Sequence, residues 1–253
     1  MKRLIFIALL VLAGFYVQGQ VRFGLKGGMN VSGFEMSSKN GVVVDFSTRF
    51  AFHAGGFADI PIGGFFSIQP ELLFSSKGAS CSLSETFTFP ATIGYADFTQ
   101  NMKQTFTPCY IELPLYLKAG FDAGTGTFIV GVGPYIAHGV GGKCKAEIKT
   151  TTLHTDEVTA VGRGKMAVFK KENLKLKGTT INFPYTYDTE VEFEKAYFKR
   201  FDFGFAGFAG YELNLGFFVI VGFQKGLFNI DNFDVEGDKM KNKTFTLSVG
   251  YKF

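Results

Sequence analysis

The sequence predicts an all-β protein: an eight-stranded antiparallel up-and-down transmembrane β-barrel of the small size class, with long extracellular loops. Three observations predict it: an alternating carboxyl-terminal segment, a high apolar content without long apolar runs, and connections that alternate between short and long. Successive side chains of a strand point to opposite faces, so alternation marks a sheet with one apolar and one polar surface.

The carboxyl-terminal segment, residues 245–253, alternates without a break. Its apolar positions are Phe245, Leu247, Val249, Tyr251 and Phe253, and its polar positions are Thr246, Ser248, Gly250 and Lys252. It runs to an aromatic last residue, as the closing strand of a bacterial outer-membrane barrel does. We therefore expect Tyr251 and Phe253 to form the assembly signal that the barrel assembly machinery reads during insertion.

The amino-terminal segment predicts export. Lys2 and Arg3 precede an apolar run from Leu4 to Val17. The run is too short to span a bilayer and no stop-transfer pattern follows it, which favours a secretory signal peptide. We expect residues 1–19 to be the signal peptide and residues 20–253 to be the barrel domain. A surface helix or a mitochondrial presequence is the alternative interpretation.

The composition narrows the class further. The chain has 32 Phe, 32 Gly, no Trp and 19% charged residues, and its mean hydropathy is +0.15. After residue 17 no apolar stretch approaches the ~20 residues that a spanning helix needs. Apolar residues without apolar runs are typical of alternating strands. The net charge of +4 is mild, so no nucleic-acid partner is expected.

Eight segments are predicted as strands, and they occupy residues 21–31, 49–60, 65–77, 110–118, 127–138, 200–212, 215–227 and 245–253. The connections after the second, fourth and sixth are brief, whereas the others are long. Short periplasmic turns and long outer loops are the outer-membrane arrangement, and an even strand number places both termini in the periplasm. Lipid offers no water to backbone groups, so the sheet must close, and side chains fill the interior of eight strands.

Two features strain this interpretation. Pro70, Pro114 and Pro134 fall inside predicted strands, where each removes a ladder hydrogen bond, so we expect bulges or kinks there. Residues 51–57 alternate poorly, which leaves the register of the second strand the least defined.

Several strand segments carry a family likeness: Gly24-Leu-Lys-Gly-Gly-Met-Asn-Val-Ser32, Phe66-Ser-Ile-Gln-Pro-Glu-Leu-Leu-Phe-Ser-Ser-Lys-Gly78, Tyr110-Ile-Glu-Leu-Pro-Leu-Tyr-Leu-Lys118, Gly133-Pro-Tyr135, Gly226-Leu-Phe-Asn-Ile230 and Leu247-Ser-Val-Gly-Tyr-Lys-Phe253. Together they resemble the PorT-type outer-membrane β-barrel proteins of Bacteroidota. The likeness covers nearly every predicted strand and includes the prolines of Gln-Pro-Glu-Leu-Leu and Glu-Leu-Pro-Leu. It implies the fold and an outer-membrane location in a Gram-negative bacterium. The founding member of that family serves type IX protein secretion, so a role accessory to secretion is implied through this resemblance alone.

Charged residues recur in the rows predicted to face the barrel interior. They are Arg22, Lys26, Glu71, Lys77, Glu112, Lys118, Asp202 and Glu212. An ion pathway is one interpretation. Both signs are present, and buried charges are tolerable when paired, so we favour a plug of mutually paired charges. A wide aqueous channel needs around 16 strands, which disfavours porin activity.

The histidines give little support for catalysis. Barrel enzymes that deacylate or acylate lipid A need a His positioned by a carboxylate and a Ser nucleophile. His53 lies mid-strand, His138 lacks a His-x-Ser spacing, and His154 lies in a Thr-rich loop, and three scattered histidines also fail as a metal cluster. We therefore expect a non-enzymatic protein without a catalytic, cofactor or metal site. A lipid A-modifying barrel enzyme and a soluble, lipocalin-like periplasmic ligand-binding barrel are the alternatives.

The three cysteines, Cys81, Cys109 and Cys144, lie in or beside the predicted outer loops, on the oxidising side. Cys81 and Cys109 bracket the second loop and could staple it. Because three is odd, connectivity cannot be read from the sequence, and a free thiol or another pairing stays open.

Loop 140–199 is where we expect a specific function to reside. Its basic residues are Arg163, Lys165, Lys170, Lys171, Lys175 and Lys177. Alternation near Ala167 and Leu174 suggests a hairpin above the membrane, which would offer a platform to a protein partner. Basic residues at that height could equally contact the phosphates of lipopolysaccharide, or only keep the loop soluble. The predicted role is structural or surface-interacting, in contact with outer-membrane lipid and lipopolysaccharide.

Overall fold

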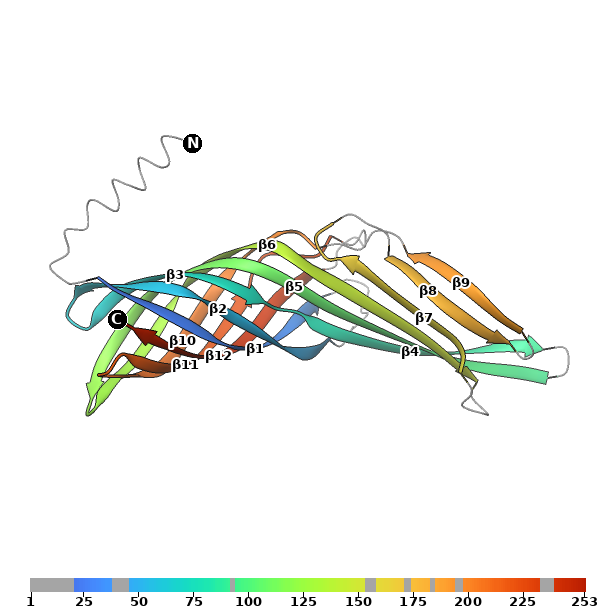
Figure 1. The fold of residues 1–253 in the computed structure, drawn as a ribbon, viewed down its shortest axis with the longest axis horizontal. Helices are drawn as coiled ribbons and strands as arrows, with labels where there is room; N and C mark the ends of the chain where they lie inside the picture. The colour runs from blue at the N-terminus through green and yellow to red at the C-terminus, as the bar shows by residue number, and fades with distance from the viewer. Residues whose placement is uncertain are drawn as a thin grey trace, which may run out of the picture.

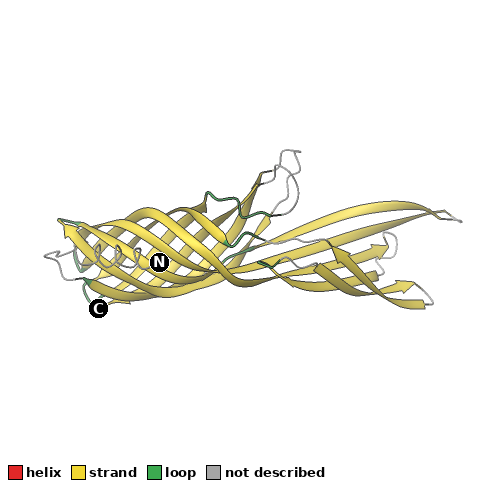
Figure 2. Cartoon of the chain, turned by 90° about the horizontal axis from the view of Figure 1, so that it is seen from above, coloured by secondary structure: helices red, strands yellow, loops and turns green. Residues whose placement is uncertain are grey.

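The computed structural model describes residues 21–37, 46–91, 94–152, 158–170, 174–182, 185–193, 198–232 and 239–253. These residues form twelve strands, paired antiparallel in one sheet (Figures 1 and 2). In this part of the chain no helix has the length and apolar character needed to cross a bilayer. The predicted signal peptide, residues 1–19, lies outside the described residues.

The strands are β1 (Arg22–Ser37), β2 (Phe46–Gly63), β3 (Phe66–Ser76), β4 (Ala79–Ala91), β5 (Gly94–Ala123), β6 (Gly126–Thr152), β7 (Val158–Ala167), β8 (Leu174–Asn182), β9 (Tyr185–Phe193), β10 (Phe201–Leu213), β11 (Phe217–Gly226) and β12 (Lys239–Lys252).

Eight of these strands pair in a circuit that returns to its starting point. From β1 the pairings pass through β2, β3, β5, β6, β10, β11 and β12, and β12 pairs with β1 again. We call these strands the ring, and they contain the segments predicted as strands from the sequence. The described residues hold twelve strands rather than eight, because β4, β7, β8 and β9 occupy stretches predicted as loops.

Tight turns join ring strands at one end, which we call the turn end. Gly64, Gly124 and Gly216 lie in these turns with φ angles of 57°, 67° and 92°. Such positive angles are strained for residues with a Cβ, and glycine adopts them freely. The carboxyl terminus lies at the same end (Figure 1).

A second sheet region, the wing, extends from the other end of the ring. It consists of β4, the outer parts of β5 and β6, and β7, β8 and β9, which pair side by side in that order. A spanning strand needs only about 9–11 residues. At 30 and 27 residues, β5 and β6 are long enough to cross and then continue into the wing. Figure 2 shows the wing leaving the ring along the long axis of the molecule.

The three in-strand prolines do not cause the expected bulges. Pro70 pairs with Leu115, Pro114 with Tyr135, and Pro134 with Phe205, and the register is the same on both sides of each pair. On β5 and β6 the register instead shifts between Cys109 and Tyr110, where the ring gives way to the wing. The extra residue is Val140 on β6, which lies between Gly139 and Gly141 and keeps its side chain exposed.

Large apolar side chains are exposed on every strand of the ring. On β5 they are Ile111, Leu113, Leu115, Leu117 and Phe121, each between 36% and 50% exposed. Soluble monomers rarely expose a continuous apolar surface of this extent, whereas a lipid-facing sheet requires one. We call this outer surface the belt. On β6 it runs from Phe128 to Val140.

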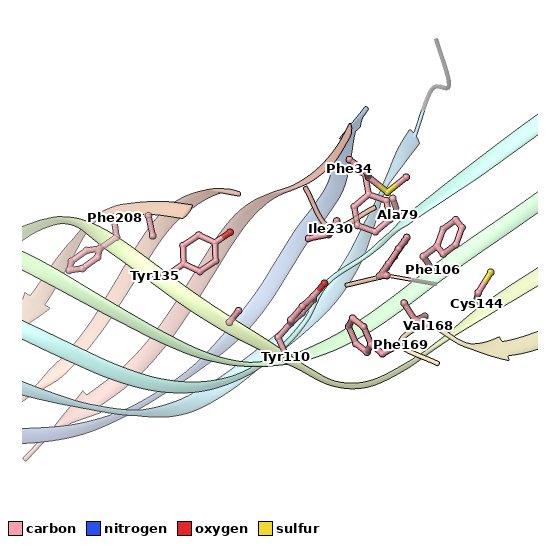
Figure 3. Close-up of a cluster of buried hydrophobic side chains, with 14 of the residues drawn as sticks. Phe34, Ala79, Phe106, Tyr110, Tyr135, Cys144, Val168, Phe169, Phe208 and Ile230 are labelled. Atoms are coloured by element: carbon pink, nitrogen blue, oxygen red, sulfur yellow. The ribbon is translucent and has the colours of Figure 1, made fainter. Parts of the chain in front are cut away.

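Buried apolar side chains close the ring at the wing end (Figure 3). The rings of Phe34, Phe106 and Phe198 pack against one another with centroids 5.2–6.1 Å apart, and Phe34 meets both other rings edge to face. Segments that follow the wing strands complete this cap, since the Phe198 amide donates to the carbonyl of Val168 (2.8 Å). The cap separates the interior of the ring from the wing surface.

Candidate functional site

The interior of the ring contains ion pairs near the turn end. Lys118 contacts the carboxylate of Asp59, and Lys252 contacts both Asp59 (3.3 Å) and Glu212. All four side chains are at most 13% exposed. Arg22 stays exposed at the mouth and has no ion pair within the described residues. A cavity of about 480 Å³ opens there between Arg22, Glu212 and Lys252.

Two further ion pairs lie deeper in the ring. Lys26 pairs with Glu71 at 2.6 Å, and Lys77 pairs with Glu112 at 2.7 Å. Both carboxylates accept a second bond, from the Gln69 amide (2.8 Å) and the Gln224 amide (3.3 Å) respectively. The Lys77 ammonium also lies over aromatic rings, 4.7 Å from the Tyr135 centroid. Buried charges persist only with such partners.

Asp202 is held by neutral donors. Its carboxylate accepts hydrogen bonds from the Tyr135 hydroxyl (3.1 Å), the Asn242 amide (2.8 Å) and the backbone amide of Phe203 (2.9 Å). Six of the eight predicted interior charges are therefore in ion pairs: Lys26, Glu71, Lys77, Glu112, Lys118 and Glu212. Asp202 is hydrogen-bonded to uncharged donors, and Arg22 is exposed. Sequence reasoning missed Asp59, because strand β2 alternates poorly, and it left Lys252 out of the network.

A polar chain in the same interior has the connectivity of a catalytic triad. The Asn30 amide nitrogen donates to the carbonyls of Phe52 (3.2 Å) and Ser76 (2.8 Å), so its oxygen accepts from His53 Nδ1 (2.7 Å). His53 Nε2 then accepts from the Ser248 hydroxyl (2.9 Å). The order matches the Ser–His–Asp triad that activates a serine nucleophile, but the neutral Asn30 stands in the place of the carboxylate.

The surroundings of Ser248 leave no room for a substrate. Asn30, His53 and Ser248 are all at most 4% exposed. The adjoining cavity is about 20 Å³, which holds about one water molecule. These hydrogen bonds therefore join β1, β2 and β12. Nothing in the sequence pattern indicated that Asn30 and Ser248 would both contact His53.

The remaining predicted chemical groups stay apart. His138 is exposed on β6, and His154 lies outside the described residues. Among the described residues no group of three or more His, Cys, Asp or Glu is arranged to hold a metal ion. All three cysteines, Cys81, Cys109 and Cys144, are free thiols. The disulfide bond between Cys81 and Cys109 that the sequence left open is therefore not formed.

The wing carries cations on one of its two faces. On β6, Lys143, Lys145 and Lys149 are exposed, whereas the alternate residues Cys144 and Ala146 are buried. Cross-strand partners share a face of the sheet. We call this surface the basic face, and it is formed by Lys103, Lys143, Lys145, Lys149, Arg163, Lys165, Lys175 and Lys177, all of which are exposed.

Register places like charges opposite one another on the basic face. Lys145 lies opposite Lys165, and Arg163 lies opposite Lys177. Directly opposed like charges destabilise a sheet. Glu147 offsets part of this charge through an exposed ion pair with Arg163 (3.1 Å).

The structure brings four of the six predicted basic loop residues together on this face: Arg163, Lys165, Lys175 and Lys177. Lys170 follows β7 outside the face, and Lys171 lies outside the described residues. Sequence reasoning missed the contribution of Lys103 on β5 and of the three lysines on β6. The alternation of Lys143-Cys-Lys-Ala-Glu-Ile-Lys149 was the available signal, because it continues a predicted strand.

Two cysteines of the wing, Cys81 and Cys144, have thiols whose pKa is raised by burial. Desolvation raises the pKa of the Cys144 thiol to about 11, and it also raises the pKa of Cys81. Low-pKa thiolates are the reactive ones. Neither thiol is therefore a nucleophile near neutral pH.

Predicted assembly residues lie at the turn end. Tyr251 packs on Phe217 (centroids 4.8 Å apart), and the amide of Phe253 donates to the carbonyl of Phe23 (2.9 Å). The carboxyl end is thus tied into the closing pair of β1 and β12. Its role as an assembly signal stays a prediction.

Comparison with known proteins agrees with this architecture. The family model of the outer membrane protein beta-barrel domain matches residues 16–232, so the chain belongs to that family. Membership places the protein in the outer membrane. No curated protein sequence matches the chain.

Several solved outer-membrane proteins are similar at low identity. OprG from Pseudomonas aeruginosa is 11% identical with a TM-score of 0.41, over 92% of this chain and 95% of that one. Neisserial surface protein A is 10% identical with a TM-score of 0.32, over 93% and 100%. The outer membrane protease OmpT from Escherichia coli is 11% identical with a TM-score of 0.34, over 94% and 97%. Likeness at this level says nothing about activity.

Proposed function

We propose that the protein is an eight-stranded transmembrane barrel with a closed lumen, which holds the wing at the bacterial surface as a non-enzymatic interaction platform. The observation that carries this proposal is the continuity of β5 and β6, which run from the belt into the wing as single strands. A partner that binds the wing therefore meets a surface fixed by the same strands that cross the membrane.

The filled lumen supports a role outside transport. Side chains of Lys77 and Glu112 are at most 1% exposed, and the cavity beside His53 and Glu112 is about 20 Å³. The apolar cap around Phe34 and Phe198 closes the wing end. Solutes would have to break several buried ion pairs in order to pass.

The orientation of the chain follows from its turns. Short turns of outer-membrane barrels face the periplasm and long connections face outward. The turn end therefore lies in the periplasm with both termini, and the wing lies outside. The likeness of the strand motifs to PorT-type proteins of Bacteroidota supports a partner protein and a role accessory to secretion.

The first test of this function measures conductance. The full chain is purified in detergent, refolded and added to planar lipid bilayers beside a 16-stranded porin as a positive control. We expect no stable channel steps from this protein. Regular open channels would overturn the closed lumen.

A second test separates the platform from an enzyme. Lipid A from a deletion strain and from its parent is compared by mass spectrometry. We expect the same acyl chains and phosphates in both. A gain or loss of one acyl chain in the deletion strain would overturn the non-enzymatic role and restore the lipid A-modifying alternative.

A further inference from the structure

The basic face is continuous with the lipid-facing surface of the ring. On β5, alternate residues from Lys103 through Thr107 to Ile111 and Leu117 share one face of the strand. Lys143 lies opposite Thr107, so it shares this face at the point where the belt ends. Lys143 therefore lies at the border between the belt and the basic face.

A second pair of cations marks the edge of the belt elsewhere on the ring. Lys225 on β11 lies opposite Lys243 on β12, and both are exposed. On the same face, the neighbouring cross-strand pair is Phe223 and Phe245, whose ring centroids lie 4.8 Å apart. Lys225 also forms an ion pair with the carboxylate of Glu35 (3.2 Å).

At the turn end, Arg22 is the exposed cation among the described residues, and it lies at the mouth of the interior rather than on the belt. Every exposed lysine of the described chain lies at the wing end of the ring or on the wing. The lysines near the turns, Lys118 and Lys252, point inward and pair with Asp59. The two edges of the belt therefore differ in charge, as the two leaflets of an asymmetric membrane do.

We propose that Lys143, Lys145 and Lys165 bind the phosphate groups of a phosphorylated glycolipid of the outer leaflet, whose acyl chains pack on the belt. This inference rests on the proposed orientation, in which the wing end faces outward. Phosphates between Lys145 and Lys165 neutralise two cations that otherwise repel each other across the strands. Lysines at a membrane surface attract anionic headgroups in this way. A soluble polyanion would neutralise the lysines, but it has no acyl chains to contact the apolar belt next to them.

The test uses the full chain in detergent micelles and native mass spectrometry. The probes are bis-phosphorylated lipid A, the same lipid A after phosphatase treatment, and heparin as a soluble polyanion. The first variant is Lys143→Gln/Lys145→Gln/Lys165→Gln. Its matched control is Lys103→Gln/Lys149→Gln/Lys177→Gln, which removes the same charge from the same face about 10 Å farther from the belt. A difference in gel mobility between the unheated and the heated protein, equal to that of the wild type, shows that each variant is folded.

We expect wild-type protein to retain bis-phosphorylated lipid A at least about tenfold better than the dephosphorylated lipid. The first variant should lose most of this preference, and the control should change it less than about threefold because its lysines lie above the headgroups. Equal retention of both lipids would overturn the proposal. Equal losses in the two variants, or a loss of heparin binding with lipid retention unchanged, would point instead to a soluble polyanion. None of these outcomes depends on lumen closure or on a protein partner, so the proposed function is tested separately.

Discussion

Charged side chains are buried and paired in the interior of the ring, whereas on the basic face of the wing they are exposed and lie opposite like charges. Inside the ring, Lys77 and Lys26 each contact a carboxylate within 2.7 Å and are almost fully buried. On the wing, Lys145 faces Lys165, and both remain exposed. Burial makes an unpaired charge very costly, whereas water and salt screen an exposed one. The interior charges are therefore paired as part of the fold, whereas Lys145 and Lys165 stay in contact with solvent.

The largest expected effect comes from breaking an interior pair. Lys77→Met leaves Glu112 charged and buried, which should destabilise the fold by about 3–5 kcal/mol. The double variant Lys77→Met/Glu112→Leu removes both charges and should recover most of that loss. Because the chain has no Trp, unfolding in urea is followed by gel mobility. A single variant as stable as wild type would show that the interior charges are not a structural pair.

The triad-like chain provides the next effect. Ser248→Ala leaves His53 Nε2 without its partner and should cost about 1–3 kcal/mol. A fluorophosphonate probe should not label wild-type Ser248, because the side chain is only 2% exposed. Stoichiometric labelling of Ser248 would contradict a structural role and would make this residue a nucleophile.

The buried side of the wing gives a pH-dependent effect. The folded Cys144 pKa of about 11 lies above the ordinary value of 9.0. The neutral thiol therefore stabilises the fold below pH 9, and this contribution is lost as pH rises from 9 to 11. Urea midpoints of the wild type should fall more steeply over that range than those of Cys144→Ala. Parallel slopes would show that Cys144 is not buried in the folded wing.

The smallest effect is expected on the basic face. Lys145→Gln should change the free energy of unfolding by no more than about 0.5 kcal/mol, because the residue is exposed. The sign should be stabilising, since repulsion from Lys165 is relieved, and the gain should shrink at 1 M salt. A loss comparable to that of Lys77→Met would erase the contrast between the two regions.

The ring could be predicted from sequence because its alternation involves large residues. Phe245 to Phe253 places an aromatic or branched side chain at every second position, and this pattern survives in β12. In β2 the same alternation is hidden, since Ala and Gly occupy both faces and Phe57 points inward. Asp59 was missed for this reason.

The wing was harder to predict because its strands do not need an apolar face of membrane width. β4 has Ser and Thr on one face and a short apolar row on the other, formed by Ala79, Cys81, Leu83, Phe87 and Phe89 and interrupted by Glu85. This alternation was an available signal, although the stretch was predicted as a loop. The basic residues of 163–177 could be identified as a cluster, but their common face depends on the pairing of β6, β7 and β8. A single amino-acid sequence does not reveal which of its distant segments pair with each other. The hydrogen bonds that link Asn30 and Ser248 through His53 were hidden for the same reason.

Epitope accessibility on intact cells tests the central claim most directly. One variant carries a short tag inserted after Thr152, at the wing, and another carries the same tag after Gly124, at the turn end. We predict that antibody binds the first on intact cells and binds the second only after the outer membrane is permeabilised. Antibody binding to the turn-end tag on intact cells, with the wing tag protected, would contradict a membrane barrel that displays its wing outside.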